Sequence, residues 1–165
     1  MVVSGGNPPL ITTNKLITMK RDTKRDPKKT ARNKADKMYQ QIGSNMYKYC
    51  AVCNKPMSCL HHYYPKSTSA GLRYEIKNGV PLCVGCHLQW HAASNPDILT
   101  GMLLFMKEQW GDNWDIELRQ QKQILQEERK VKDLAWYKVQ IDILQELLNN
   151  SEANAYLPPE DLWRT

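Results

Sequence analysis

The clearest hydrophobic period in the chain lies between residues 26 and 46. Apolar side chains recur there every three or four residues, which predicts one buried face of a helix. Asp26 is a good N-cap, Pro27 suits the first helical position, and Gly43 suits the C-terminal cap. We therefore expect an amphipathic helix over residues 26–46, with basic side chains on its other face. Its apolar stripe contains Ala31, Ala35, Met38, Tyr39 and Ile42.

Two short β-prone runs follow, at residues 60–64 and 80–82, with Pro, Ser, Thr and Gly between them. They can pair as a β-hairpin, and a helix is expected from Val84 or Cys86 through His91. These elements form a module over residues 47–93.

Residues 94–150 are predicted to be a helical extension. Asn95 can cap a helix that Pro96 opens and that ends before Gly111. Residues 114–149 then contain neither Pro nor Gly, and apolar residues in their later half are spaced by three and four. One helix of that length would be unusual, so we expect a bend near residues 126–133 or packing against a partner. A homodimer through these C-terminal helices is one interpretation. Residues 1–25 are expected to be a flexible basic arm, and residues 151–165 a tail.

Charge is distributed unevenly along the 165 residues. The chain has a formal net charge of +6 and a pI of about 9.0, whereas residues 15–37 alone carry ten basic and three acidic residues. A local excess of this kind favours a phosphate backbone as partner, although a solvated helix face is the alternative. The candidate nucleic-acid contacts are Lys20, Arg21, Lys24, Arg25, Lys28, Lys29 and Arg32, with Lys66 and Arg73 in the central module.

The sequence offers no sign of membrane insertion or export. No run approaches the roughly 18 apolar residues of a membrane span, and the N-terminus lacks the basic and apolar regions of a secretory signal. We therefore expect a cytoplasmic protein whose cysteines are reduced.

Four of the five cysteines form two Cys-x-x-Cys pairs. Four thiolates complete a tetrahedral zinc ion and leave no position open for chemistry, so this site is predicted to be structural. Redox-active dithiols fit the pattern less well, and Cys59 is expected to be a free thiol. The predicted zinc ligands are Cys50, Cys53, Cys83 and Cys86.

All four histidines lie within 31 residues of sequence. His87 and His91 share a helix face at a spacing of four, whereas His61 and His62 point to opposite faces of a strand. We therefore expect His61, His87 and His91 to bind a second, catalytic metal, with His62 off the metal as a general base. A surface histidine is the alternative for His91. Asn78 is expected to brace the hairpin loop, and an Asn-Gly turn is compatible with that role.

The order Cys-x-x-Cys, His-His, Asn, Cys-x-x-Cys-His-x-x-x-His over residues 50–91 resembles the zinc-supported form of the HNH (ββα-metal) endonuclease family. The resemblance implies an α+β fold with a small, treble-clef-like, zinc-bound ββα core. It also implies hydrolysis of DNA phosphodiester bonds, by nicking or double-strand cleavage, with Mg²⁺, Mn²⁺, Ni²⁺ or Zn²⁺ as catalytic metal. By the same resemblance His62 is the general base, Asn78 the middle Asn, and His61 and His87 metal ligands.

Two finer resemblances refine this expectation. The spacing of His87 and His91 after Asn78 is similar to that in nuclease colicins, which implies that both bind the metal. The run Leu72-Arg73-Tyr74-Glu75-x-x-Asn78 is similar to phage NinG-type recombination nucleases, which implies a phage or mobile-element origin. The expected partner is DNA, either duplex or branched. The alternative function is a non-catalytic zinc-knuckle protein that binds nucleic acid and does not need His62.

Overall fold

The computed structural model describes residues 26–127 and 132–153. The described part is mostly helical, with one two-stranded antiparallel sheet, in agreement with the expected α+β class. Its elements in chain order are α1 (Pro27–Met46), β1 (Cys59–His62), the 3₁₀ helices η1 (Ala70–Tyr74) and η2 (Ile76–Asn78), β2 (Gly79–Leu82), α2 (Val84–Ala92), α3 (Asp97–Trp110), α4 (Trp114–Glu127) and α5 (Leu134–Ala153).

The expected hairpin and following helix are confirmed. Strands β1 and β2 pair in a register that sets Cys59 opposite Leu82 and His62 opposite Gly79. Helix α2 begins two residues after β2 ends. The hairpin therefore brings residues near position 60 next to the start of α2.

Helix α1 confirms the predicted N-cap and corrects the predicted C-cap. The Oδ1 atom of Asp26 accepts a hydrogen bond from the Lys28 N–H at 2.9 Å. Gly43 does not end the helix, which continues to Met46. A Cβ atom at position 43 would lie 2.8 Å from the Cβ atom of Leu60. The glycine therefore lets α1 approach β1 closely, a tertiary requirement that a capping pattern does not reveal.

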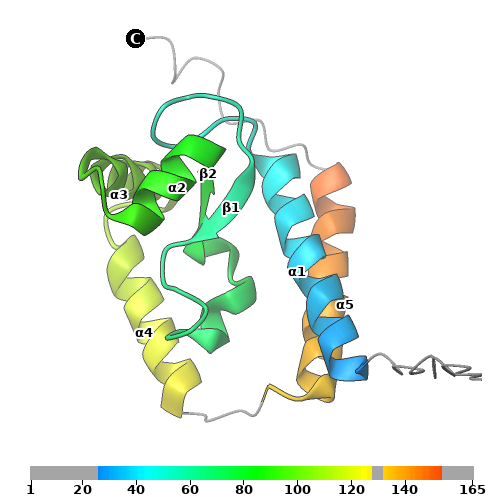
Figure 1. The fold of residues 1–165 in the computed structure, drawn as a ribbon. Helices are drawn as coiled ribbons and strands as arrows, with labels where there is room; N and C mark the ends of the chain where they lie inside the picture. Colours follow the sequence, from blue (N-terminus) through cyan, green and yellow to red (C-terminus); the bar gives the residue numbers. More distant parts are fainter. Residues whose placement is uncertain (1–25, 128–131, 154–165) are drawn as a thin grey trace, which may run out of the picture.

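The hairpin lies between two groups of helices (Figure 1). Helix α1 packs against β1 and η1 on one side, with α5 lying along its outer face. On the other side α3 contacts β2, and α4 contacts both 3₁₀ helices. The core fills the space between these layers with buried residues that include Ile42, Leu60, Leu82, Met102 and Leu118.

The expected break in the long C-terminal segment is confirmed, because α4 ends at Glu127 and α5 begins at Leu134. The buried residues of α5 are Tyr137, Leu144 and Leu148, and this helix packs along α1 of the same chain. That apolar face is thus covered without a second chain, and the homodimer stays a prediction. Among the described helices, none combines the length and apolar character that crossing a membrane requires.

Candidate metal centres

Four cysteine side chains converge where the turn before β1 meets the start of α2. Their sulfur atoms all lie within 4.8 Å of one another. The Sγ atom of Cys53 is 3.6 Å from that of Cys83 and 3.5 Å from that of Cys86. Zinc with Zn–S bonds of about 2.3 Å holds its sulfurs roughly 3.8 Å apart. The thiol cluster, which we define as Cys50, Cys53, Cys83 and Cys86, can therefore hold one metal ion, and zinc suits its donors.

Backbone turns present both Cys-x-x-Cys pairs. The Asn54 N–H donates to the Cys50 carbonyl at 3.1 Å, and Asn54 adopts φ 54°, which Asn tolerates better than most residues. Cys83 caps α2 and accepts from the Cys86 N–H at 3.4 Å. Burial raises the pKa of Cys83, but the N–H of Cys86 and the neighbouring thiols outweigh burial and lower that pKa to about 7. This environment favours the thiolate, which is the form that binds a metal.

Three imidazoles converge further along α2. His61 comes from β1, and His87 and His91 come from successive turns of α2. Their ligating nitrogens lie within 4.8 Å of one another, and the two helical Nε2 atoms are 3.1 Å apart. The ring centroid of His61 is 4.9 Å from that of His87 and 5.4 Å from that of His91. We call His61, His87 and His91 the histidine cluster.

The chemistry of the histidine cluster fits a divalent cation. The Nε2 atom of His61 is buried and has no hydrogen-bond partner among the described residues, an arrangement that is rare in proteins unless a further group binds there. Burial, reinforced by any positive charge on His87 and His91, lowers the pKa of His61 to about 3. Burial also lowers the pKa of His87. Neutral imidazole is the form that binds a metal, so the cluster can accept a cation at neutral pH.

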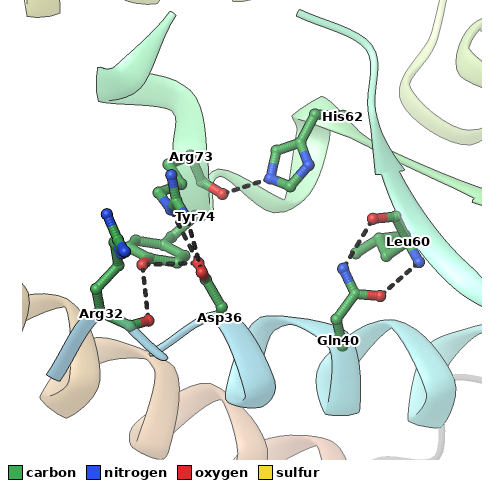
Figure 2. Close-up of polar contacts among 7 residues, drawn as sticks. All are labelled: Arg32, Asp36, Gln40, Leu60, His62, Arg73 and Tyr74. Carbon is green, nitrogen blue, oxygen red and sulfur yellow. Dashed lines mark hydrogen bonds and ion pairs between the residues drawn. The ribbon is translucent and has the colours of Figure 1, made fainter. Parts of the chain in front are cut away.

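His62 points away from these three imidazoles, as its place on the strand predicts. Its Nε2 atom lies 2.7 Å from the backbone oxygen of Arg73 (Figure 2). A carbonyl oxygen can only accept, so Nε2 carries the proton and Nδ1 is left as the basic nitrogen. The Tyr39 ring stacks on the imidazole with centroids 4.9 Å apart. Burial outweighs this hydrogen bond and lowers the pKa of His62 to about 4.

Asn78 is fully buried and braces the loop between the strands. Its Oδ1 atom accepts from the Tyr64 N–H at 2.7 Å, and its Nδ2 atom donates to the carbonyls of Tyr64 and Leu72 at 3.1 and 3.2 Å. Gly79, which follows it, has φ −96°, so no glycine-type turn is needed here. The geometry agrees with the expected bracing role, and its part in function stays a prediction.

The candidate phosphate contacts lie in different surroundings. Lys28, Lys29 and Lys66 are exposed and Arg32 is half-buried, whereas Arg73 is held in an ion pair with Asp36 at 2.6 Å. Arg73 therefore has a partner inside the chain. Of the two candidate phosphate contacts in the central module, Lys66 is the more accessible. The positions Lys20, Arg21, Lys24 and Arg25 lie outside the described residues.

Sequence reasoning missed three α1 residues that contact the hairpin module through polar or aromatic groups. Asp36 binds Arg73, Tyr39 stacks on His62, and Gln40 binds the backbone N–H and carbonyl of Leu60 at 2.8 and 3.0 Å (Figure 2). The spacing of these three residues places them on one helix face. That spacing places an acid and an amide beside the apolar stripe of the helix, and this pattern could have predicted that α1 makes polar contacts with the hairpin module.

Comparison of this chain with protein-family models, with curated proteins and with solved structures finds no match.

Proposed function

We propose that this protein is a metal-dependent HNH endonuclease that hydrolyses DNA phosphodiester bonds. The observation that carries the proposal is the division among the four histidines. Three imidazoles converge on one point, while the fourth is held separately by the Arg73 carbonyl, and its Nδ1 atom has no hydrogen-bond partner among the described residues. A purely structural zinc domain needs no such arrangement, because four thiolates already complete its metal site.

In this proposal His61, His87 and His91 hold a divalent cation, which when bound neutralises charge that develops on the phosphate. Three ligands leave coordination positions for water and a phosphate oxygen. Imidazole donors suit Ni²⁺ and Zn²⁺ better than Mg²⁺, which prefers oxygen ligands. The rank order of metals in a cleavage assay therefore reports on the ligand set.

His62 is the proposed general base. Its Nδ1 atom accepts a proton from the attacking water, and its Nε2–H continues to donate to the Arg73 carbonyl, a bond that strengthens when the ring becomes positive. The lowered pKa keeps the ring neutral before reaction. An anionic phosphate nearby raises that pKa, whereas a divalent cation in the histidine cluster would lower it.

The proposed DNA surface includes Lys66. This exposed side chain is close enough to add to the effect of burial in lowering the pKa of His61, His62 and His87, so its charge acts on the same region. A cation beside the proposed reaction centre can bind a phosphate of the substrate backbone. The basic face of α1 offers further contacts.

A non-catalytic nucleic-acid-binding protein is the second candidate. The thiol cluster and the net charge of +6 favour it, because both suit a zinc-stabilised binder. It gives no role to His62 or to the unpaired nitrogen of His61.

Incubation of the full chain with supercoiled plasmid separates the two functions. We expect conversion to nicked or linear DNA with Ni²⁺, Mn²⁺, Mg²⁺ or Zn²⁺ and none with a chelator. His87→Ala is expected to abolish cleavage, and the matched control Leu88→Ala, at the next position of α2 and 63% exposed, is expected to cleave normally. Binding without cleavage under every metal would favour the second candidate. Equal cleavage by both variants would point to a contaminating nuclease.

A further inference from the structure

We propose that Asp36 is a positioning residue for His62, acting through Arg73 from a different element of the fold. The inference rests on the proposed function, because it assigns the helix α1 a part in orienting the proposed base. It concerns one peptide unit, the one that joins Arg73 to Tyr74, whose oxygen accepts the hydrogen bond from His62.

The carboxylate of Asp36 holds the side chains at both ends of that peptide unit. Its two oxygens pair with the Arg73 guanidinium, with Nε–Oδ1 and Nη2–Oδ2 distances of 2.8 and 2.6 Å. The Tyr74 hydroxyl donates to Oδ1 of the same carboxylate at 3.0 Å. Figure 2 shows all three contacts meeting at Asp36. A bidentate pair fixes the plane of the guanidinium as well as its distance.

Fixing both side chains limits rotation of the peptide between them. The oxygen of that peptide lies 2.7 Å from Nε2 of His62, so its direction decides which ring nitrogen keeps the proton. If the peptide turns away, the reason for placing the proton on Nε2 disappears, and the Nδ1–H tautomer becomes available. Asp36 therefore helps to keep Nδ1 of His62 unprotonated, although it does not contact His62.

Helix α1 supplies a rigid support for this arrangement. Tyr39, one turn after Asp36, is 1% exposed and stacks on His62 with an interplanar angle of 21°. Gln40 binds both backbone groups of Leu60, two residues before His62. The helix thus contacts the side chains on either side of the His62 acceptor, the face of the His62 ring and the strand that carries it. The ion pair is only partly enclosed, with side chains 19% and 35% exposed, so geometry rather than burial of charge gives Asp36 its effect.

Asp36→Asn tests the inference, because it removes one oxygen acceptor and the charge while keeping the shape. We expect kcat for plasmid nicking to fall roughly 10- to 100-fold, as is usual when a group that orients a site residue is lost, with KM for DNA and metal within twofold. Asp36→Glu keeps a carboxylate for Arg73 and is expected to recover most of kcat. The matched control is Glu117→Gln, which removes the exposed Lys77–Glu117 pair of 3.0 Å, neither member of which is among the groups that shift the pKa of His62.

Long-range ¹⁵N–¹H NMR of the full chain gives a readout that does not depend on nuclease activity. The wild-type ring of His62 is expected to show the Nε2–H tautomer, and Asp36→Asn is expected to increase the Nδ1–H form, while Glu117→Gln leaves it unchanged. A tautomer change in a protein that never cleaves DNA would uphold the positioning role and refute the nuclease. An unchanged tautomer and kcat in Asp36→Asn would overturn the inference. An unfolded Asp36→Asn protein by circular dichroism would also overturn it, because the carboxylate would then serve the fold as a whole.

Discussion

The thiol cluster and the histidine cluster share α2 but differ in how completely the protein surrounds them. Cys83 and Cys86 lie at the start of that helix, and His87 and His91 follow in its next turns. The thiol cluster has four donors, and three of its residues are buried. The histidine cluster has three donors, and its last member, His91, is exposed. Four donors complete the coordination of the thiol cluster, which we call the closed site, whereas three donors leave the histidine cluster, which we call the open site, with positions for further ligands.

Because of this difference, we expect the histidine cluster to depend on the thiol cluster, whereas the thiol cluster should not depend on the histidine cluster. A metal in the thiol cluster ties the start of α2 to the turn before β1, and so fixes how far His87 and His91 lie from His61. The reverse does not hold, because the histidine cluster joins elements that the thiol cluster has already brought together. Loss of the closed site should therefore disable the open one, whereas loss of the open site should leave the closed one intact.

The largest expected effect comes from Cys83→Ser. Structural zinc supplies about 10–16 kcal/mol of apparent binding free energy in zinc-finger peptides, comparable with the roughly 5–15 kcal/mol that stabilises a whole domain. We expect the variant to lose one zinc per chain and to lose the folded hairpin and α2. Metal analysis and circular dichroism measure both. Cys59→Ser is the control, since Cys59 is not among the four cysteines that converge in the thiol cluster, and equal damage in the two variants would contradict the assignment.

The next-largest effects separate the proposed metal ligand His87 from the proposed base His62. His87→Ala and His62→Ala are both expected to keep zinc in the thiol cluster. His62→Ala is expected to lose roughly 10²- to 10⁴-fold in cleavage rate, and His87→Ala is expected to abolish cleavage. They should differ in calorimetric titration with Ni²⁺ of the zinc-loaded chain. His87→Ala removes a ligand and should weaken binding, whereas His62→Ala should bind Ni²⁺ normally. Normal Ni²⁺ binding by His87→Ala would show that the histidine cluster is not the second metal site.

Local spacing made much of both sites predictable. The two Cys-x-x-Cys pairs, the hairpin and α2 follow from patterns within a few residues, and the four-residue spacing of His87 and His91 places both on one helix face. The break between α4 and α5 was likewise expected, because a helix spanning both segments would be unusually long.

Contacts between distant segments were not predictable in this way. Asp36 and Arg73 are 37 residues apart, and each has an ordinary alternative as a solvated charge. Gly43 has the local signature of a helix end, yet its lack of a side chain serves contact with Leu60. The sequence shows that a residue is small or charged, whereas the partner depends on how the elements pack.

A third prediction concerns the close contact between Gly43 of α1 and Leu60 of β1. Alanine normally stabilises a helix interior relative to glycine by roughly 0.5–1 kcal/mol. Gly43→Ala should instead destabilise the protein by about 1–3 kcal/mol, because its Cβ would overlap Leu60. Urea unfolding measures the difference. Gly85 in α2 is the control, since a Cβ atom added there would come no closer than 4.0 Å to the Sγ atom of Cys83, and Gly85→Ala should not destabilise. A gain in stability at Gly43 would show that α1 can move away from β1.

The smallest expected effect shows whether DNA binds beside the histidine cluster or beside the thiol cluster. The charge of Lys66 contributes to lowering the pKa of His61 and His87, so Lys66 lies near the histidine cluster. Lys55 is also exposed, and its carbonyl accepts a hydrogen bond from the Cys50 N–H, so Lys55 lies beside the thiol cluster. Each lost phosphate contact flattens the slope of log affinity against log salt by roughly 0.9 for duplex DNA. Lys66→Ala should therefore flatten the slope by about that amount, and Lys55→Ala should leave it unchanged, although both variants lose the same charge. Fluorescence anisotropy with a labelled duplex, in Ca²⁺ to limit cleavage, measures both slopes. Equal flattening would mean that net charge alone sets the affinity, and the reverse pattern would place DNA on the closed site.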